Sequence, residues 1–244
     1  MRIFAIADLH LGFSTGKWMD RFGDHWIDHP ERIAAAWRER IDAKDIVLLP
    51  GDFSWAMKPS EVSIEFEWLA DLPGRKVLVK GNHDYWWPKS VAKLQELLPP
   101  DTFAIKKRSV VVDGVPFIGV RGGDFATYEG EVTDDIRRGL EREERELRAS
   151  VEHLRSTYSG DVPPIALFHY PPFPVGDSSS RFTEILEEAG CRACVFGHLH
   201  SEPEWKAVFQ GRSGGIDYRL VACDAIGFEP VLLDLDPLPE APCG

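Results

Sequence analysis

The sequence predicts an α/β protein built around a largely parallel β-sheet. Short apolar runs recur along the chain, and stretches with helical spacing of apolar residues separate the first of them. Such alternation of strands and helices is typical of a parallel sheet with helical crossovers. Most of these runs also stop at polar residues that can bind metals or substrates, which is where α/β proteins place their sites. A hairpin signal, Asp113-Gly114, adds an antiparallel section.

The first half of the chain provides the clearest alternation. Three nearly continuous apolar runs predict strands that are buried on both faces. The expected strands are residues 3–7, 46–49 and 76–79. The segments after them carry apolar side chains three or four residues apart, which predicts amphipathic helices. The expected helices are residues 31–41, 60–72 and 88–98. Residues 13–30 show no clean period and are expected to form a long loop, in which His25 and His29 are interpreted as hydrogen-bonded residues rather than metal ligands.

The second half contains a long helix and several further strands. The hairpin strands are expected at residues 109–112 and 115–120, followed by a charged helix over 134–158. Buried strands are predicted at 165–168 and 193–196, with a short helix over 182–189 between them. The remaining apolar runs are interpreted as antiparallel strands at 205–209, 218–223 and 231–235. We expect one domain over residues 1–235 and a tail, 236–244, without chemistry.

Composition and charge restrict the function classes. The chain has 244 residues, 43% of them hydrophobic and 28% charged, as in ordinary globular proteins. Its net charge of −12 argues against a general nucleic-acid binder, because such proteins need cations against phosphates. No stretch reaches the roughly 20 apolar residues that span a bilayer, and the start of the chain resembles no export signal. We therefore expect a cytoplasmic protein that acts on a small molecule; the sequence does not indicate the oligomeric state.

The cysteines do not indicate a metal or disulfide site. Cys191 and Cys194 have the spacing of a redox or zinc pair, but no second pair accompanies them. Cys223 and Cys243 stand alone. Buried side chains flanking a strand are the favoured interpretation.

The residues at the strand ends are those that bind metals through nitrogen and oxygen. They comprise carboxylates, an amide and imidazoles: Asp8, His10, Asp52, Asn82, His169, His198 and His200. A single residue separates Asp8 from His10, and another separates His198 from His200, so the two side chains of each pair project to one side of an extended chain. This set exceeds the three or four ligands of one catalytic zinc ion and suits two ions that share a carboxylate. Mn, Fe, Zn or Co fit such mixed ligands.

The strand-end motifs occur in the order Asp8-Leu9-His10, Gly51-Asp52, Gly81-Asn82-His83-Asp84, His169 and Gly197-His198-Leu199-His200. This ordered set resembles the motif series of the calcineurin-like metallophosphoesterases. The resemblance spans residues 8–200 and is specific as an ordered set. It implies an α/β/β/α sandwich of two mixed sheets flanked by helices, with a two-metal site at one edge. The second sheet is implied by the resemblance alone.

The resemblance also implies roles for individual residues. One metal ion would be bound by Asp8, His10 and His200, the other by Asn82, His169 and His198, with Asp52 as the bridge. His83 would face the substrate without binding metal, and Asp84 would orient its imidazole. A hydroxide bridging two divalent or trivalent ions would attack a phosphoester directly. His83 would stabilise the developing charge or protonate the leaving group.

Two departures from the family pattern argue against a protein phosphatase. Gly51-Asp52 continues as Phe53-Ser54-Trp55, without the Asp-Arg-Gly continuation of the Ser/Thr protein phosphatases, and position 84 is Asp rather than Glu. Four aromatic residues that follow the motifs are candidates for a wall against a base or acyl group, namely Phe53, Trp55, Trp86 and Trp87, although packing beneath the loops explains them at least equally well.

Two further residues are candidates for substrate contacts. Arg121 follows a predicted strand and is a candidate for a phosphate contact, against the alternative of a surface arginine. Tyr170 is a candidate because it follows a predicted ligand, although it equally suits a turn.

The predicted function is hydrolysis of a small-molecule or nucleotide phosphodiester or phosphomonoester. A nuclease is less favoured because the chain is acidic and shows no DNA-binding extension. The alternative from another class is a non-catalytic scaffold on the same fold. Retention of the metal-ligand set and of His83 favours the enzyme, since a scaffold has no need of them. Metal-dependent turnover discriminates the two.

Overall fold

Two mixed β-sheets form the centre of the protein, as a computed structural model shows for residues 1–123 and 133–235. The predicted tail, 236–244, lies outside these described residues. The first sheet has the strand order β11 (Val231–Leu232), β1 (Ile3–Ala5), β2 (Ile46–Leu49), β3 (Arg75–Leu78) and β4 (Thr102–Ala104). The second has the order β5 (Val110–Val112), β6 (Val115–Val120), β7 (Ile165–Phe168), β8 (Ala193–Phe196), β10 (Ile216–Leu220) and β9 (Gly211–Ser213).

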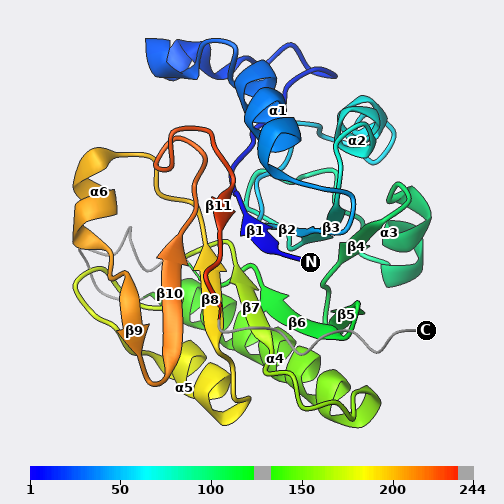
Figure 1. Cartoon of the computed structure of the whole chain (residues 1–244). Helices are drawn as coiled ribbons and strands as arrows, with labels where there is room; N and C mark the ends of the chain where they lie inside the picture. The colour runs from blue at the N-terminus through cyan, green and yellow to red at the C-terminus, as the bar shows by residue number, and fades with distance from the viewer. Residues whose placement is uncertain (124–132, 236–244) are drawn as a thin grey trace.

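Helices cover the outer faces of both sheets (Figure 1). Their bounds are α1 (His29–Arg40), α2 (Ser63–Ala70), α3 (Val91–Leu97), α4 (Asp134–Thr157), α5 (Arg181–Glu188) and α6 (Glu202–Ala207). The loop before α1 contains two short 3-10 helices, η1 (Met19–Phe22) and η2 (Asp24–Trp26). Helices α1 to α3 lie on the side of the first sheet, and α4 and α5 lie against the second (Figure 1). The α/β/β/α sandwich implied by the family resemblance is confirmed.

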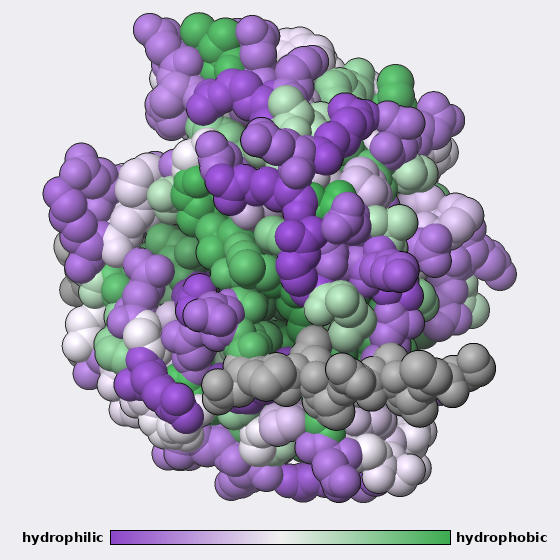
Figure 2. All heavy atoms as spheres, in the orientation of Figure 1, coloured by the Kyte–Doolittle hydropathy of each residue, from purple (hydrophilic) through white to green (hydrophobic). Residues whose placement is uncertain are grey.

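The alternation of side chains along each strand explains why the runs are apolar throughout. In β2, Ile46 and Leu48 belong to the core between the two sheets, whereas Val47 and Leu49 belong to the core beneath α1 and α2. Successive side chains of a strand point to opposite faces, and here both faces are covered. Figure 2 shows polar residues over the outer helices and apolar residues gathered in a hollow over β1, β8 and β11.

Parallel pairing brings the carboxyl ends of the strands together at one edge. In the first sheet β1, β2, β3 and β4 run parallel, and in the second β6, β7, β8 and β10 do. The two sheets are also joined there, because the amide of Ala7 donates to the Val221 carbonyl at 2.7 Å and the Cys223 amide donates to the Ala7 carbonyl at 3.0 Å. Residues that follow strands of different sheets therefore meet at this edge.

The structure corrects the sequence prediction near the carboxyl end. Residues 205–209 are not a strand: residues 202–207 form α6. Its start is a capping box, in which Ser201 and Glu204 satisfy each other's backbone amides, and Pro203 lies in the first turn. This local signal outweighs the apolar run that follows. In addition, β10 pairs parallel with β8 rather than only in antiparallel fashion.

The cysteines in the described residues are buried and free. Cys191, Cys194 and Cys223 are at most 6% exposed, and burial raises the pKa of each thiol. Their interpretation as buried apolar side chains is confirmed. Across residues 1–123 and 133–235, each helix is too short or too polar to cross a lipid bilayer.

Candidate metal centre

The chain turns sharply at the residues that were predicted to bind metal. Asp8, His10, Asp52 and His198 have positive φ angles of 60°, 45°, 50° and 76°. Residues other than glycine rarely adopt this left-handed conformation, and such strain concentrates at functional sites. The turns aim the side chains out of the strand direction and into the space between the sheet ends.

Glycines beside these residues leave room for the carboxylates. A Cβ atom on Gly81 would lie 2.0 Å from Asp52 Oδ1, and one on Gly197 would lie 2.1 Å from Asp8 Oδ2. No side chain fits at either position. The glycines of the strand-end motifs are therefore required by close packing against the two acids.

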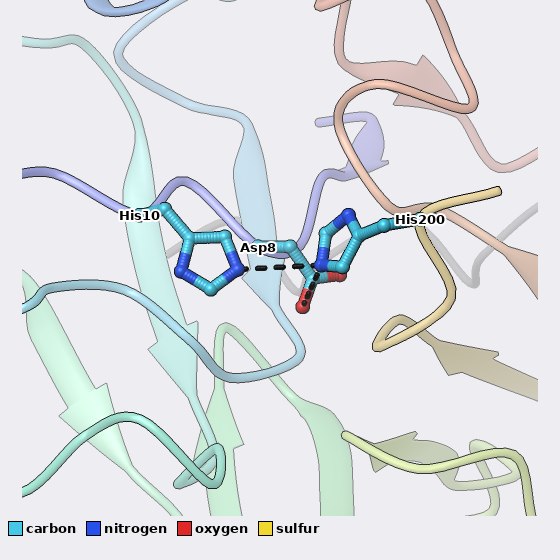
Figure 3. Close-up of side chains that lie close together, drawn as sticks. All are labelled: Asp8, His10 and His200. Carbon is cyan, nitrogen blue, oxygen red and sulfur yellow. Dashed lines mark hydrogen bonds and ion pairs between the residues drawn. The ribbon is translucent and has the colours of Figure 1, made fainter. Parts of the chain in front are cut away.

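The first group of candidate ligands is Asp8, His10 and His200, whose side chains converge (Figure 3). One ligand atom from each lies within 4.8 Å of the others. The Nε2 atoms of His10 and His200 are 3.3 Å apart, and His200 Nε2 lies 3.9 Å from Asp8 Oδ1. Asp8 and His10 are buried, so these groups face one another rather than water.

The second group lies beside the first and shares Asp8 with it. Asp8, Asp52 and His169 also place ligand atoms within 4.8 Å of one another. His169 Nε2 is 3.6 Å from Asp52 Oδ2 and 2.5 Å from Asn82 Oδ1. His198 Nδ1 lies 3.1 Å from the same Asn82 oxygen. The structure therefore brings together all seven predicted ligands, from strand ends of both sheets.

The chemistry of this cluster fits cations. Asp8 Oδ1 is buried and accepts no hydrogen bond from any described residue. Burial raises the pKa of Asp8 well above its ordinary value, and the neighbouring Asp52 carboxylate raises it further. Two buried acids held this close are costly unless positive charge compensates them. Imidazole and carboxylate donors suit Mn, Fe, Zn and Co.

Hydrogen bonds on the far side of two imidazoles orient them toward the cluster. Asp224 Oδ1 and Oδ2 each lie 3.1 Å from His200 Nδ1, and the Pro50 carbonyl lies 3.1 Å from His169 Nδ1. Each acceptor fixes a proton on Nδ1, which leaves Nε2 as the ligand atom. Sequence reasoning missed Asp224. Its signal was the same as for the other acids, a carboxylate shortly after an apolar strand.

The Asp224→Asn variant is expected to bind Mn²⁺ about 10-fold more weakly, because an amide holds the His200 tautomer less firmly than a carboxylate does. Calorimetric titration of metal-free protein with Mn²⁺ measures the change. Asp217→Asn is the matched control, since Asp217 lies on β10, the strand that precedes Asp224, and pairs with Arg219 instead. Equal Mn²⁺ affinity in wild type and Asp224→Asn would exclude this orienting role.

His83 lies at the edge of the cluster and is partly open to solvent. Its side chain is 34% exposed, and its Nε2 is 4.0 Å from Asp52 Oδ2. Its Nδ1 is buried and has no hydrogen-bond partner in the described part of the chain. Burial lowers the pKa of the imidazole, and the Asp52 carboxylate opposes this shift. The exposed edge of the ring is thus available to a bound molecule.

Asp84 does not orient His83, contrary to the prediction. Its Oδ1 accepts hydrogen bonds from the amides of Phe53 and Ser54 and from the Trp86 indole, and its Oδ2 accepts one from the Gly81 amide. Burial and the Asp52 charge raise the pKa of Asp84 to about 7, while these donors lower it. The carboxylate therefore joins the backbone after β2 to the backbone after β3, because amide donors surround it on every side.

Of the aromatic residues predicted as a possible substrate wall, Trp55 rather than Trp86 faces the cluster. Trp86 is 0% exposed and packs against Phe53 and Phe66, so its proposed substrate contact is wrong. Trp55, by contrast, is half-buried, with its ring centroid 4.9 Å from that of His10 and 4.4 Å from that of His83. Trp55 is closer to the candidate ligands than Trp86 because it lies in the turn after Asp52, which faces the cluster.

The other two predicted substrate residues follow strands of the second sheet, Arg121 after β6 and Tyr170 after β7. The Tyr170 ring centroid is 4.1 Å from that of His198, which places it at the rim of the cluster. Arg121 Nη2 pairs with Glu143 at 3.0 Å, so its guanidinium points toward α4 rather than the metal ligands. The Arg121 carbonyl accepts hydrogen bonds from the amides of His169 and Tyr170 at 3.1 and 2.9 Å.

Residues 13–30 supply the wall on the side of His10. Trp26 is buried, with its ring centroid 6.3 Å from that of His10 and 5.8 Å from that of His200. His29 Nε2 lies 3.0 Å from the Leu9 carbonyl and Nδ1 lies 3.1 Å from that of Trp26. The interpretation of His29 as a hydrogen-bonded residue is confirmed, and it ties the first ligand loop to α1.

Comparison with known proteins agrees with this geometry. The profile of the calcineurin-like phosphoesterase family matches residues 1–202. The gene 66 proteins of Mycobacterium phages L5 and D29 are each 32% identical to the chain, over 78 and 83 residues. These segments amount to 32% and 34% of this chain and to 37% and 40% of the relatives, so the similarity spans less than half of their length.

Two solved structures share the fold. A protein of unknown function from Aquifex aeolicus matches with a TM-score of 0.50 and 14% identity over 95% of both chains. The phosphopantetheinyl hydrolase from Mycobacterium tuberculosis matches with a TM-score of 0.53 and 13% identity over 97% of this chain and 96% of that one. The family profile, in contrast, covers every candidate ligand from Asp8 to His200. The chain belongs to the calcineurin-like phosphoesterase family.

Proposed function

We propose that the protein is a two-metal phosphoesterase that hydrolyses a phosphodiester or phosphomonoester of a small molecule or nucleotide. The observation that carries the proposal is the convergence of seven nitrogen and oxygen donors around a buried Asp8 oxygen that accepts no hydrogen bond among the described residues. Membership of the phosphoesterase family supports it. The intact ligand set also favours an enzyme over a scaffold.

Each of two sets of residues would bind one metal ion. Asp8, His10 and His200 would hold one ion, Asn82, His169 and His198 the other, and Asp52 would contact both. Bound ions of this kind activate water as a nucleophile and neutralise charge on phosphoryl oxygens. Asp224 and the Pro50 carbonyl keep the imidazoles oriented for this purpose.

His83 is the residue that would act on the substrate itself. Its exposed edge lies beside Asp52, so a phosphoester at the cluster would be within reach of Nε2. An imidazole N–H there can donate a hydrogen bond to a phosphoryl oxygen or to the leaving group. Trp55 packs against the His83 ring and limits its movement, which keeps that donor in position.

A small-molecule substrate fits the charge of the chain. The net charge of −12 disfavours a long nucleic acid, whose binding needs many cationic contacts. The solved structure described as a phosphopantetheinyl hydrolase shows the same fold, which is consistent with a small-molecule ester.

Hydrolysis of bis(4-nitrophenyl) phosphate and of 4-nitrophenyl phosphate by Mn²⁺-loaded protein tests the proposal. We expect turnover of at least one ester, loss of turnover on addition of a chelator, and recovery when Mn²⁺ is restored. Asp52→Asn is expected to lose turnover of both, because Asp52 Oδ2 lies 3.6 Å from His10 Nε2 and 3.6 Å from His169 Nε2, one candidate ligand of each ion. No turnover of either ester with Mn, Fe, Zn or Co, in folded protein of measured metal content, would contradict an enzyme acting on simple esters.

A further inference from the structure

A cavity of about 460 Å³ lies beside the candidate metal centre, and half of the residues that line it are cations. It is bounded by the residues that follow β3, β4 and β6 and by one face of α4. Its cations are Lys80, Lys89, Lys106, Lys107, Arg121 and Arg142. The carboxylates in its lining are Glu143 and Glu146. In a chain with a net charge of −12, this excess of positive charge in one concavity is unusual.

Part of the lining is rigid and already neutralised. Glu143 is 6% exposed and accepts from Arg121 at 3.0 Å and from Arg142 at 3.3 Å. Lys107 pairs with Glu146 at 3.6 Å, and Lys106 Nζ donates to the Pro88 carbonyl. These contacts hold α4 against the sheet edge and fix the shape of the cavity. In these ion pairs, both carboxylates of the lining already have cationic partners.

Two lysines of the lining have no paired carboxylate among the described residues, although the charges of Asp84, Glu143 and Glu146 act on one of them, Lys80. The side chains of Lys80 and Lys89 form no ion pair or hydrogen bond with any residue in 1–123 or 133–235. Lys80 is half-buried and shares the cavity with Arg121. Solvated surface lysines need no partner, but like charges confined in one concavity repel each other and attract anions.

Backbone segments that line the cavity also carry or contact candidate metal ligands. Lys80 precedes the candidate ligand Asn82 by two residues in the chain. On the second sheet, the Arg121 carbonyl accepts from the amide of the candidate ligand His169 at 3.1 Å. The same two strand ends therefore supply metal ligands on one side and cations on the other.

We propose that this cationic cavity binds a phosphate group on the same molecule whose phosphoester is hydrolysed at the metal centre. The substrate is then a small molecule that carries a second phosphate at a distance from the ester. This inference rests on the proposed function and adds the substrate class to it. Lys80 and Lys89 supply the charge that meets the second phosphate.

A matched series of 4-nitrophenyl phosphodiesters tests the inference. The second ester arm is a short, medium or long alkyl chain that ends either in a phosphate or in a hydroxyl. For at least one length, the terminal phosphate is expected to lower KM about tenfold in the wild type. Lys80→Gln and Lys89→Gln are expected to bring this ratio of KM values toward one. Lys44→Gln, an exposed lysine before β2 at the opposite sheet edge, is expected to keep it.

The outcomes separate this inference from the proposed function. Hydrolysis of the hydroxyl series with no preference for a terminal phosphate at any length would overturn the inference alone. An effect of inorganic phosphate on hydroxyl-ester turnover that depends on Lys89, without that preference, would show an independent anion site and would also overturn it.

If neither series is hydrolysed, phosphodiester hydrolysis is excluded from the proposed function and binding decides the inference. The probe is then an alkyl bisphosphate titrated calorimetrically into metal-free protein. Binding by the wild type that is lost in Lys80→Gln and Lys89→Gln supports the cationic cavity as a phosphate site. No binding by folded wild-type protein overturns it.

Discussion

Replacing His83 with glutamine is expected to lower kcat for phosphoester hydrolysis by about 10²- to 10⁴-fold. Glutamine keeps an N–H donor near the position of the ring but cannot exchange a proton near neutral pH. The metal content is expected to stay the same, because His83 Nε2 lies 4.0 Å from Asp52 Oδ2 at the open edge of the cluster. Steady-state kinetics of the Mn²⁺-loaded variant, together with metal analysis of the same sample, measures both effects.

A second histidine provides the control for this experiment. His153 lies on α4, where its Nδ1 is 2.8 Å from Ser109 Oγ, away from the cluster. His153→Gln is expected to leave kcat unchanged. A His83→Gln enzyme with full metal content and wild-type kcat would remove His83 from the chemistry. Loss of a metal ion from that variant would instead make His83 a ligand.

Replacing Asp84 with alanine is expected to lower the free energy of unfolding by at least about 4 kcal/mol. The substitution leaves the amides of Gly81, Phe53 and Ser54 and the Trp86 indole without their acceptor. A buried donor that loses its partner costs about 1–3 kcal/mol, and partial relaxation keeps the total below the simple sum. Urea denaturation of the metal-free protein measures the loss without contributions from bound ions.

The Asp84→Asn variant tests whether the loss of stability follows the number of hydrogen bonds that are lost. Its Oδ1 can still accept the three hydrogen bonds that Asp84 Oδ1 accepts, whereas its amide nitrogen would face the Gly81 amide. Asp84→Asn is therefore expected to cost about 1–3 kcal/mol, less than alanine. Asp161→Ala, at an exposed position, controls for the loss of an acid. Equal stability of Asp84→Ala and wild type would show that these donors find other partners.

Local sequence signals were sufficient for most of the secondary structure. β2, β7 and β8 have the predicted bounds because each run is apolar on both faces and ends at a polar or turn residue. The long helix α4 was predicted within one residue because its apolar stripe has a helical period over its whole length. The predicted strand at 205–209 was wrong because apolar content was given more weight than the cap formed by Ser201 and Glu204.

The candidate metal ligands could also be named from the sequence, because strand ends in a parallel sheet share one edge. That argument requires only chain order and strand direction. It cannot say which acceptor lies behind each imidazole. Asp224 reaches His200 across 24 residues, and only the pairing of β10 with β8 brings them together.

The sequence by itself determined the α/β class, the order of the strand-end motifs and the residue types of the candidate centre, since these depend on periodicity and spacing along the chain. Only the tertiary structure decided that Asp84 joins two loops, that Trp55 rather than Trp86 faces the cluster, and that cations from four segments line one cavity. The physical reason is that burial and hydrogen-bond partners arise between residues far apart in the chain, where no local pattern records them.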